Sequence, residues 1–260
     1  MSKTKIMPLV LGVLLLMAMQ AGSQTLRIMS YNIHHAQNES GVMDVKGLAD
    51  FIVKMKPDLV ALQEVDSMCK RSGRIDIAAE LGRLTGMYYY FGKAMNYDGG
   101  GYGEAFLSRF PIQSISTVAL PIQPNKNREP RAAIEAVMLL PNQKTIKLVA
   151  THLDHLDDET DRLMQTRFMA DRYRQETMPF ILIGDMNAEP GSAPIKQLME
   201  VATAPALDKN QFTWPSGVPT KKIDYMLLSN NANWQCKKFE VPEEKHISDH
   251  RPVQMELRIK

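Results

Sequence analysis

Residues 180–190 read Phe-Ile-Leu-Ile-Gly-Asp-Met-Asn-Ala-Glu-Pro. The first four residues are apolar and partly β-branched, and so short a run predicts a buried strand that stops at Gly184. Asp185 and Asn187 follow, and Pro190 prevents a helix, so both polar side chains are expected in a loop at a sheet edge. Such a pair can hold a water, a metal-bound oxygen or a phosphate. An ordinary Asp/Asn turn that closes a core strand explains this stretch equally well.

Other predicted strands carry polar side chains at their ends in the same way. Apolar residues at helical spacing predict helices over 45–56, 75–84 and 158–174, and the glycine-rich residues 96–103 predict a loop. Strands outnumber helices, so we predict a single α/β domain over residues 24–260, with helices outside paired sheets. The polar groups at strand ends are Asn32, Glu64, His152, Asp185, Asn187, Asp224, Asp249 and His250.

The first 23 residues differ from the rest of the chain. Lys3 and Lys5 precede an apolar run over 6–19, and Ala-Gly-Ser at 21–23 offers a small-residue cleavage site. This pattern is typical of a secretory signal peptide, which predicts a periplasmic or extracellular protein. No second segment is long and apolar enough to cross a membrane, so no membrane span is expected.

Composition limits the choice of partner. The chain has 260 residues, of which 44% are hydrophobic and 23% charged, as in an ordinary soluble protein. Without the two lysines of the signal segment, 29 basic and 29 acidic residues remain. This balance favours a small or locally recognised substrate and leaves nucleic acid open. Cys69 and Cys236 lie in no zinc motif, and the sequence leaves open whether they form a disulfide.

The polar groups at the strand ends suggest a chemistry as a set. Carboxylates and amides with two imidazoles, and without thiolates, suit Mg²⁺ or Mn²⁺ better than a closed zinc site. A histidine oriented by a carboxylate supplies acid–base chemistry near neutral pH. Each residue alone also has an ordinary structural explanation, and His34, His35, His155 and His246 are interpreted as surface or loop histidines.

Seven segments then reveal a resemblance. In their order along the chain they resemble the motifs of the endonuclease/exonuclease/phosphatase superfamily, which includes deoxyribonuclease I, abasic-site endonucleases, neutral sphingomyelinases and inositol polyphosphate 5-phosphatases. The resemblance implies a four-layer α/β sandwich, with two central, mainly antiparallel sheets flanked by helices and the site at one end. The segments are Ser-Tyr-Asn at 30–32, Leu-Gln-Glu-Val at 62–65, Tyr-Gly-Glu-Ala-Phe-Leu-Ser-Arg at 102–109, Thr-His-Leu-Asp at 151–154, Gly-Asp-Met-Asn-Ala at 184–188, Ile-Asp-Tyr at 223–225 and Ser-Asp-His-Arg-Pro-Val at 248–253.

The resemblance also implies roles for the strand-end residues. Glu64 is expected to be the main ligand of Mg²⁺ or Mn²⁺, and Asn32 and Asp249 are expected either to complete the metal site or to support its ligands from behind. It implies in addition that the metal and the histidines neutralise charge on the phosphate oxygens during in-line attack of water.

The remaining strand-end residues receive catalytic roles from the same resemblance. Asp185 is expected to orient the attacking water, while Asn187 and His152 hold phosphate oxygens. His250, oriented by Asp224, is expected to act in acid–base chemistry or in stabilising the transition state. Whether Asp185 or His250 is the formal base stays open.

Two further details of the resemblance concern deoxyribonuclease I. Glu104 stands where that enzyme has a glutamate paired with a catalytic histidine, which predicts a Glu104–His152 pair. Asn-Arg-Glu-Pro at 127–130 is similar to a segment with a phosphate-contacting arginine, so Arg128 and the nearby Arg131 are expected to bind substrate phosphate together with Tyr102. Without the resemblance, both arginines are more simply explained as part of a solvated loop.

The sequence thus predicts an exported, monomeric, metal-dependent phosphoesterase, and phosphodiesters are favoured. Nucleic acids, phospholipid headgroups and sugar phosphates all remain candidate substrates. A phosphomonoesterase acting on inositol or sugar phosphates is the alternative, although the aromatic residue and the arginine of the 5-phosphatase signature are replaced by Ile183 and Ala188. A non-catalytic binding protein on the same fold is the alternative from a different class.

Overall fold

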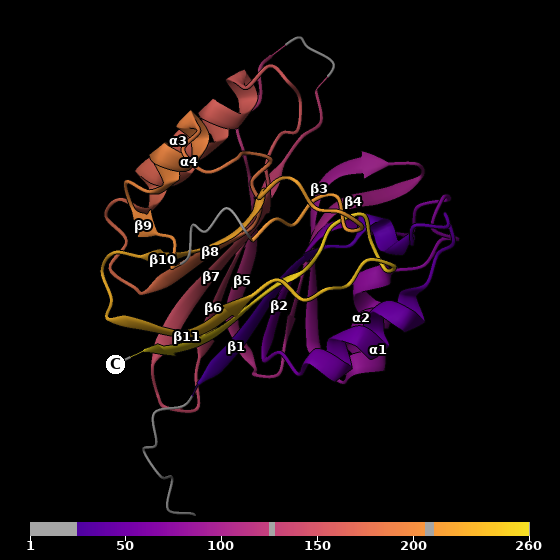
Figure 1. Cartoon of the computed structure of the whole chain (residues 1–260), viewed down its shortest axis with the longest axis horizontal. Coiled ribbons are helices and arrows are strands. Elements are labelled where there is room, and N and C mark those ends of the chain that lie inside the picture. Colours follow the sequence, from indigo (N-terminus) through magenta and orange to yellow (C-terminus); the bar gives the residue numbers. More distant parts are fainter. Residues whose placement is uncertain (1–24, 125–127, 206–210, 260) are drawn as a thin grey trace, which may run out of the picture.

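The computed structural model describes residues 25–124, 128–205 and 211–259. These residues form two six-stranded sheets that pack face to face, with helices on the two outer faces (Figure 1). The predicted signal peptide lies outside the described residues. No helix within the described ranges is long and apolar enough to cross a membrane.

The first sheet contains the N-terminal and C-terminal strands. Its order is β11-β12-β1-β2-β4-β3, and every neighbouring pair is antiparallel except the parallel pair β1 and β2. The strands are β1 (Leu26–Asn32), β2 (Leu59–Ser67), β3 (Tyr88–Tyr97), β4 (Gly100–Ser108), β11 (Trp234–Glu240) and β12 (Val253–Ile259).

The second sheet is built on the same plan. Its order is β5-β6-β7-β8-β10-β9, and here the parallel pair is β7 and β8. Both sheets are therefore mixed but mainly antiparallel, as the sequence predicted. The strands are β5 (Ile112–Ala119), β6 (Ala132–Leu139), β7 (Thr145–His152), β8 (Phe180–Asp185), β9 (Ala202–Thr203) and β10 (Asp224–Ser229).

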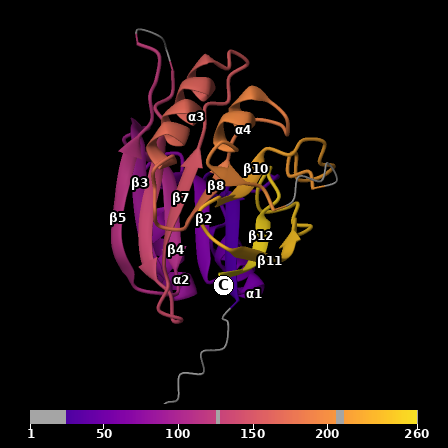
Figure 2. The ribbon, with the colours of Figure 1, turned by 90° about the vertical axis from the view of Figure 1, so that its left-hand side faces the viewer.

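Helices cover the outer face of each sheet. Figures 1 and 2 show α1 and α2 on one side of the paired sheets, and α3 and α4 on the other. A short 3-10 turn, η1, follows β1 directly. The bounds are η1 (His34–Ala36), α1 (Val45–Met55), α2 (Ile77–Thr85), α3 (Thr160–Tyr173) and α4 (Ala193–Leu198).

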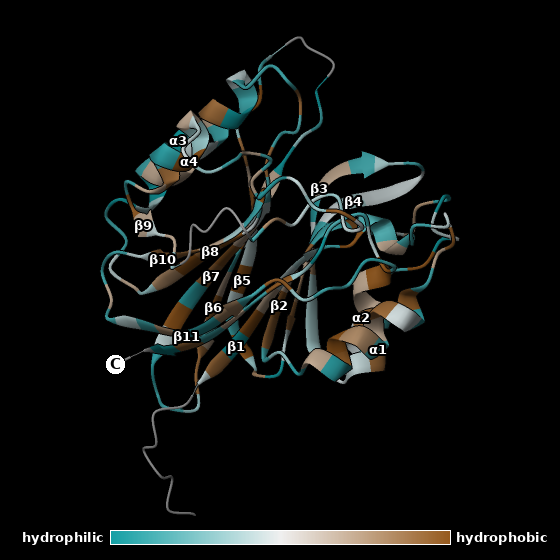
Figure 3. Cartoon of the chain, in the orientation of Figure 1, coloured by the Kyte–Doolittle hydropathy of each residue, from teal (hydrophilic) through white to brown (hydrophobic). Residues whose placement is uncertain are grey.

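Three apolar clusters hold these four layers together. The central cluster lies between the sheets and includes Ile28, Phe106 and Ile183, while the two outer clusters join each sheet to its own helices. Figure 3 shows that the brown, apolar residues concentrate in the central strands. Alternate side chains of a strand point to opposite faces, so a strand in such a sandwich is apolar on both sides. This explains continuous apolar runs such as 180–183.

The residues at the two ends of α1 show why the helix begins and ends where it does. Asp44 caps α1, because its Oδ1 accepts a hydrogen bond from the backbone N–H of Gly47 at 2.7 Å. The helix ends where Lys56 adopts a left-handed conformation, directly before Pro57. Along the chain between these ends, Leu48 and Ile52 are buried against the first sheet.

One prediction about local structure was wrong. Residues 96–103 were expected to form a loop, but they belong to the hairpin of β3 and β4, which turns at Asp98 and Gly99. Glycines at 100, 101 and 103 allow close strand approach, since a Cβ at Gly103 would lie 2.1 Å from the carbonyl oxygen of Gly92. The glycine-rich composition therefore reflects close packing in a sheet.

The topology brings the polar strand ends to one edge. Parallel neighbours end at the same edge of a sheet, and an antiparallel neighbour begins there. His152 is accordingly in register with Asp185, and Asp185 with Asp224. In the other sheet, Asn32 ends β1 opposite Gln63 of β2.

Candidate active site

A cleft of about 770 Å³ opens at this edge and is lined by residues from both sheets. It gathers most of the residues that the sequence singled out. Asn32, Asp224 and Glu104 are buried behind its surface rather than lining it. The predicted site residues that line the cleft are Glu64, Tyr102, Arg131, His152, Asp185, Asn187, Asp249 and His250.

Asn32 is the buried link between the two sheets. Its Nδ2 donates to Glu64 Oε1 and to Asp185 Oδ2, each at 3.0 Å, and lies 3.4 Å from His250 Nε2. Its Oδ1 accepts from the backbone N–H of His34 at 3.1 Å, which fixes the orientation of the amide. Asn32 thus positions a carboxylate from each sheet at the same cleft.

His250 is held between two carboxylates. Nδ1 lies 3.0 Å from Asp224 Oδ2, and Nε2 lies 3.6 Å from Asp185 Oδ2. Burial alone would lower the pKa of His250, but Asp224 and Asp185 outweigh it and raise the pKa to about 10. The imidazole is therefore a cation at neutral pH.

The pKa of Asp185 is also raised, but by different causes. Burial and the neighbouring Asp224 raise the pKa of Asp185, while His250 and the hydrogen bonds from Asn32 and the backbone of Asn187 act against the increase. The carboxyl group therefore holds or releases a proton closer to neutral pH than an exposed aspartate does.

His152 is surrounded by donors. Nδ1 lies 3.0 Å from Arg131 Nη1, and Nε2 lies 3.0 Å from Asn187 Nδ2. Burial, followed by Arg131, lowers the pKa of His152 well below its usual value. Both close contacts are with donors, which a neutral ring accommodates better than a protonated one, and the carboxylate oxygen Asp185 Oδ2 lies farther away, 3.6 Å from Nε2. Together with burial, this favours the neutral form of His152.

The predicted Glu104–His152 pair was wrong. Arg131 lies at Nδ1 of His152 and Asn187 at Nε2, so both ring nitrogens have partners other than Glu104. Glu104 is buried, its Oε2 has no hydrogen-bond partner among the described residues, and burial raises its pKa to about 8 although Arg131 acts against this. At neutral pH Glu104 therefore carries its proton.

The structure separates the two candidate arginines. Arg131 lies at the cleft, where its Nη2 also lies 3.0 Å from His155 Nδ1. Arg128 is outside the cleft and forms ion pairs with Asp158 and Asp161, next to and within α3. Of the two arginines, the structure therefore brings Arg131 to the cleft and places Arg128 beside α3. Tyr102, whose pKa is raised by burial, lines the cleft as predicted.

Several residues at the cleft were missed by the sequence. The guanidinium of Arg71 lies over the rings of Tyr97 and Tyr102, at 4.4 and 5.5 Å from their centroids, and pairs with Asp66. On the opposite side, Trp214 and Lys221 line the cleft. These residues belong to no motif, and none follows a strand end, so no sequence signal marked them.

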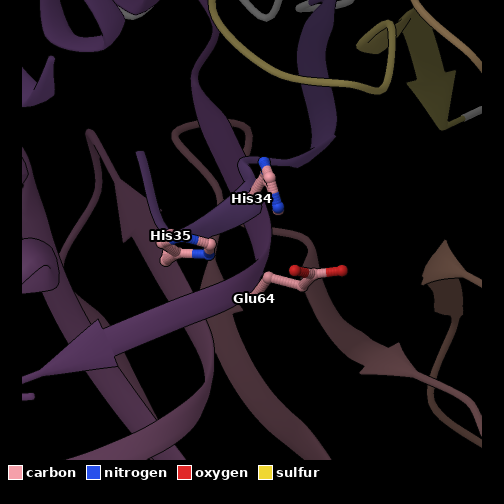
Figure 4. Close-up of side chains that lie close together, drawn as sticks. All are labelled: His34, His35 and Glu64. Carbon is pink, nitrogen blue, oxygen red and sulfur yellow. The ribbon is translucent and has the colours of Figure 1, made fainter. Parts of the chain in front are cut away.

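The four histidines that were interpreted as surface or loop residues differ in burial and in their position relative to the cleft. His246 is exposed, as expected, whereas His155 lines the cleft. His34 and His35 lie beside Glu64, as Figure 4 shows, and His35 is buried. Burial lowers the pKa of His35, with Arg71 and His34 acting in the same direction.

The residues at the cleft fit a hard divalent cation. Glu64 and Asp249 are half-buried carboxylates that line the same cleft, and carboxylate oxygens are the donors that Mg²⁺ and Mn²⁺ take. The oxygens of Asp249 accept only long contacts, from Trp214 Nε1 and Ser248 Oγ at 3.4 Å each, among the hydrogen bonds of the described residues. Neither Cys69 nor Cys236 forms a disulfide or contributes to this site.

A family model described as the Endonuclease/Exonuclease/phosphatase family matches residues 29–250. The chain belongs to this family. Its members hydrolyse phosphate esters and are typically dependent on a divalent metal. The family's fold is the α/β sandwich described above. No curated protein matches the chain.

Solved structures of the family share the fold. A family protein from Bacteroides thetaiotaomicron is 18% identical over 91% of this chain and 98% of its own, with a TM-score of 0.75. A mannosyl-6-phosphatase from the same species is 18% identical over 89% and 99%, with a TM-score of 0.70. The human Nocturnin catalytic domain, with a bound sulfate anion, is 20% identical over 91% and 94%, with a TM-score of 0.70.

Proposed function

We propose that this protein hydrolyses phosphate esters by attack of water, with a divalent cation as cofactor and phosphodiesters as the first candidate class. The observation that carries the proposal is the buried network of Asp224, His250, Asp185 and Asn32, in which neighbouring groups lie within 3.6 Å. A network that holds one cation between two buried carboxylates is costly for stability alone. It is expected where charge must be stabilised during a reaction.

His250 supplies positive charge to the phosphoryl group. Asp224 holds Nδ1, Nε2 lies 3.6 Å from Asp185 Oδ2, and the residue lines the cleft, so the positive charge of the ring can act on the developing negative charge. A buried cation that is already oriented requires no rearrangement when the charge develops. Because His250 is protonated before the reaction, it is unsuited to accept a proton from water.

Asp185 is the better base. Its raised pKa lies closer to neutral pH, which is where a general base is most effective. Asn32 and the backbone N–H of Asn187 fix both oxygens, at 3.0 and 2.9 Å. The carboxylate can therefore orient a water and take its proton as the water attacks.

The other side of the cleft binds the phosphate oxygens. Asn187 Nδ2 and the neutral ring of His152 are 3.0 Å apart, and both reach the cleft. Arg131 adds a positive charge behind His152. A divalent cation at Glu64 and Asp249, when bound, would neutralise phosphate charge and activate water.

A phosphomonoester of a sugar or inositol is the second candidate class. Cationic side chains of Arg71, Arg131 and Lys221 line the cleft, and they suit the dianion of a monoester. Glu104 and Arg128, the two features that resembled deoxyribonuclease I, are also not arranged as that resemblance implied. One structural neighbour is named a mannosyl-6-phosphatase.

Hydrolysis of bis-p-nitrophenyl phosphate and p-nitrophenyl phosphate, measured side by side, tests the proposal. Each is assayed with Mg²⁺, with Mn²⁺ and with EDTA. His250→Ala is compared with His246→Ala, whose exposed side chain lies outside the cleft. We expect metal-dependent cleavage of the diester that His250→Ala abolishes and His246→Ala preserves.

Two other outcomes would change the proposal. Cleavage of the monoester alone would transfer the proposal to a phosphatase. Absence of hydrolysis on both esters, and on a panel of sugar phosphates, phospholipids and oligonucleotides with either metal, would overturn it in favour of a binding protein.

We also propose that the chain is exported. The lysines, apolar run and small residues of residues 1–23 support this. Mass spectrometry of the protein recovered from its native host gives the test, with an N-terminus at or near residue 24 expected. An N-terminus at Met1 in the cytoplasmic fraction would contradict it.

A further inference from the structure

The turn η1 places two histidines beside a proposed metal ligand. His34, His35 and Ala36 all have positive φ angles, of 43°, 45° and 61°, which non-glycine residues rarely adopt in succession. This left-handed turn directs both imidazole rings to one side, and their centroids are 4.5 Å apart. Ordinary surface histidines do not require such a turn.

Glu64 meets the two rings. One potential ligand atom from each of His34, His35 and Glu64 lies within 4.8 Å of the other two. In Figure 4 both rings and the carboxylate converge on the same space. Glu64 also has a positive φ, of 59°, at an irregularity in the pairing of β2 with β4, and this irregularity aims its side chain away from the regular sheet.

His35 carries an unused lone pair. The residue is 8% exposed, and its Nδ1 has no hydrogen-bond partner in the part of the chain that the structure describes. Nε2 lies 3.2 Å from Gln37 Oε1, which can only accept. The Gln37 amide is fixed in that orientation because its Nε2 donates to the carbonyl of Gly41 at 2.9 Å. Nε2 of His35 therefore carries the proton, and the lone pair of the buried Nδ1 is available to a metal ion.

This arrangement is typical of a metal-binding imidazole. A histidine that ligates a metal through one nitrogen usually donates its other N–H to a carbonyl or carboxylate, which fixes the tautomer. Arg71 is the cation that acts most strongly on His35, and two hydrogen bonds of 2.8 Å to Asp66 compensate its charge. The charge of Arg71 therefore does not exclude a cation at the turn.

We propose that His34, His35 and Glu64 bind a second divalent cation, distinct from the one expected at Glu64 and Asp249. Two imidazoles and one carboxylate suit a borderline metal such as Zn²⁺ or Mn²⁺ better than Mg²⁺. Glu64 Oε1 accepts from Asn32, so Glu64 lies between the buried catalytic network and the two histidines. Binding by itself does not depend on the proposed function, whereas any role in hydrolysis rests on it.

Metal binding by the untagged protein tests the inference. The apoprotein is dialysed against Zn²⁺ with Mg²⁺ in excess, and bound zinc is counted by mass spectrometry. Co²⁺ absorption then reports nitrogen ligation. His34→Ala and His35→Gln are compared with His246→Ala, and we expect each of the first two to lower Zn²⁺ affinity at least about tenfold while the third matches wild type.

A fourth variant separates a metal site from a packing effect. Gln37→Ala removes the group that orients His35 but no ligand, and we expect it to weaken Zn²⁺ binding about tenfold. His34 is half-buried, so its alanine variant is expected to fold, and circular dichroism checks this. Equal Zn²⁺ stoichiometry and affinity in the wild type and in folded His34→Ala and His35→Gln would overturn the inference. Zinc binding through these histidines in a protein inactive on all phosphate esters would instead support the inference and contradict only the proposed function.

Discussion

Nδ1 of His250 lies 3.0 Å from Oδ2 of Asp224, and both side chains are buried at the edge where the two sheets meet. The pair comes from a loop before β12 and from the first residue of β10, which belong to different sheets. Because the contact spans the sandwich, the protonated imidazole of His250 depends on the packing of the two sheets. Under the proposed function, hydrolysis therefore requires native packing.

Replacing Asp224 by Asn should impair both rate and pH dependence. Asp224 raises the pKa of His250, so its loss lowers that pKa and the imidazole loses its proton at a lower pH. We expect kcat to fall by about 10²–10⁴-fold and the alkaline limit of activity to move to lower pH. Steady-state kinetics from pH 6 to 10 check this. An unchanged alkaline limit would show that His250 is not the group titrating there.

Replacing Glu104 by Gln should stabilise the protein at alkaline pH. The pKa of Glu104 is raised from 4.5 to about 8 by burial, so the unfolded state loses a proton before the folded state does. The contribution of Glu104 to folding is therefore fully present below the unfolded pKa and declines by about 1.4 kcal/mol per pH unit between these values. Urea unfolding at pH 5, 6.5 and 8 should show the advantage of Glu104→Gln growing with pH. Glu243→Gln, on an exposed side chain, should show no such trend.

The two arginines provide a matched comparison. Arg131→Gln should lower kcat/KM by about 10–100-fold, because it removes the buried positive charge next to His152. Arg128→Gln should leave kcat/KM of the folded enzyme within about twofold, because its ion pairs lie outside the cleft. The opposite ranking would restore the assignment that the sequence favoured.

Removal of the metal should be reversible. We expect EDTA to abolish hydrolysis and added Mg²⁺ or Mn²⁺ to restore it, because the carboxylates of Glu64 and Asp249 fit a hard cation. Glu64→Gln keeps the size of the side chain but removes its charge, so it should raise the Mg²⁺ concentration needed for half-maximal activity. A Mg²⁺ titration of both proteins provides the measurement. Equal titration curves would exclude Glu64 as a ligand.

The sequence predicted the fold and most of the site for a physical reason. Apolar runs that end in polar residues specify strands, and the carboxyl ends of parallel strands share one edge. Asn32, His152 and Asp185 all end strands of a parallel pair, so their convergence follows from the topology once the fold class is known. Site residues that do not end a strand carry no comparable pattern in the sequence.

The sequence did not predict which side chains contact each other at the site. Glu104 and Arg131 are both long side chains that could pair with His152, and their spacing along the chain does not say which one meets it. Arg128 and Arg131 are likewise three residues apart, but they face α3 and the cleft respectively. Arg71 lies at the cleft in contact with Tyr97 and Tyr102 of the β3–β4 hairpin and paired with Asp66, contacts that no sequence motif marks.

By itself, the sequence determined the layered α/β architecture, the family and the edge at which the polar residues gather. These properties depend on periodicity and on the order of short motifs, which are local and can be read along the chain. Only the tertiary structure decided that Arg131 rather than Glu104 meets His152, that Glu104 Oε2 is buried without a hydrogen-bond partner among the described residues, and that His34 and His35 face Glu64. Those contacts join segments distant in sequence, and burial, backbone handedness and sheet packing select among several candidate partners.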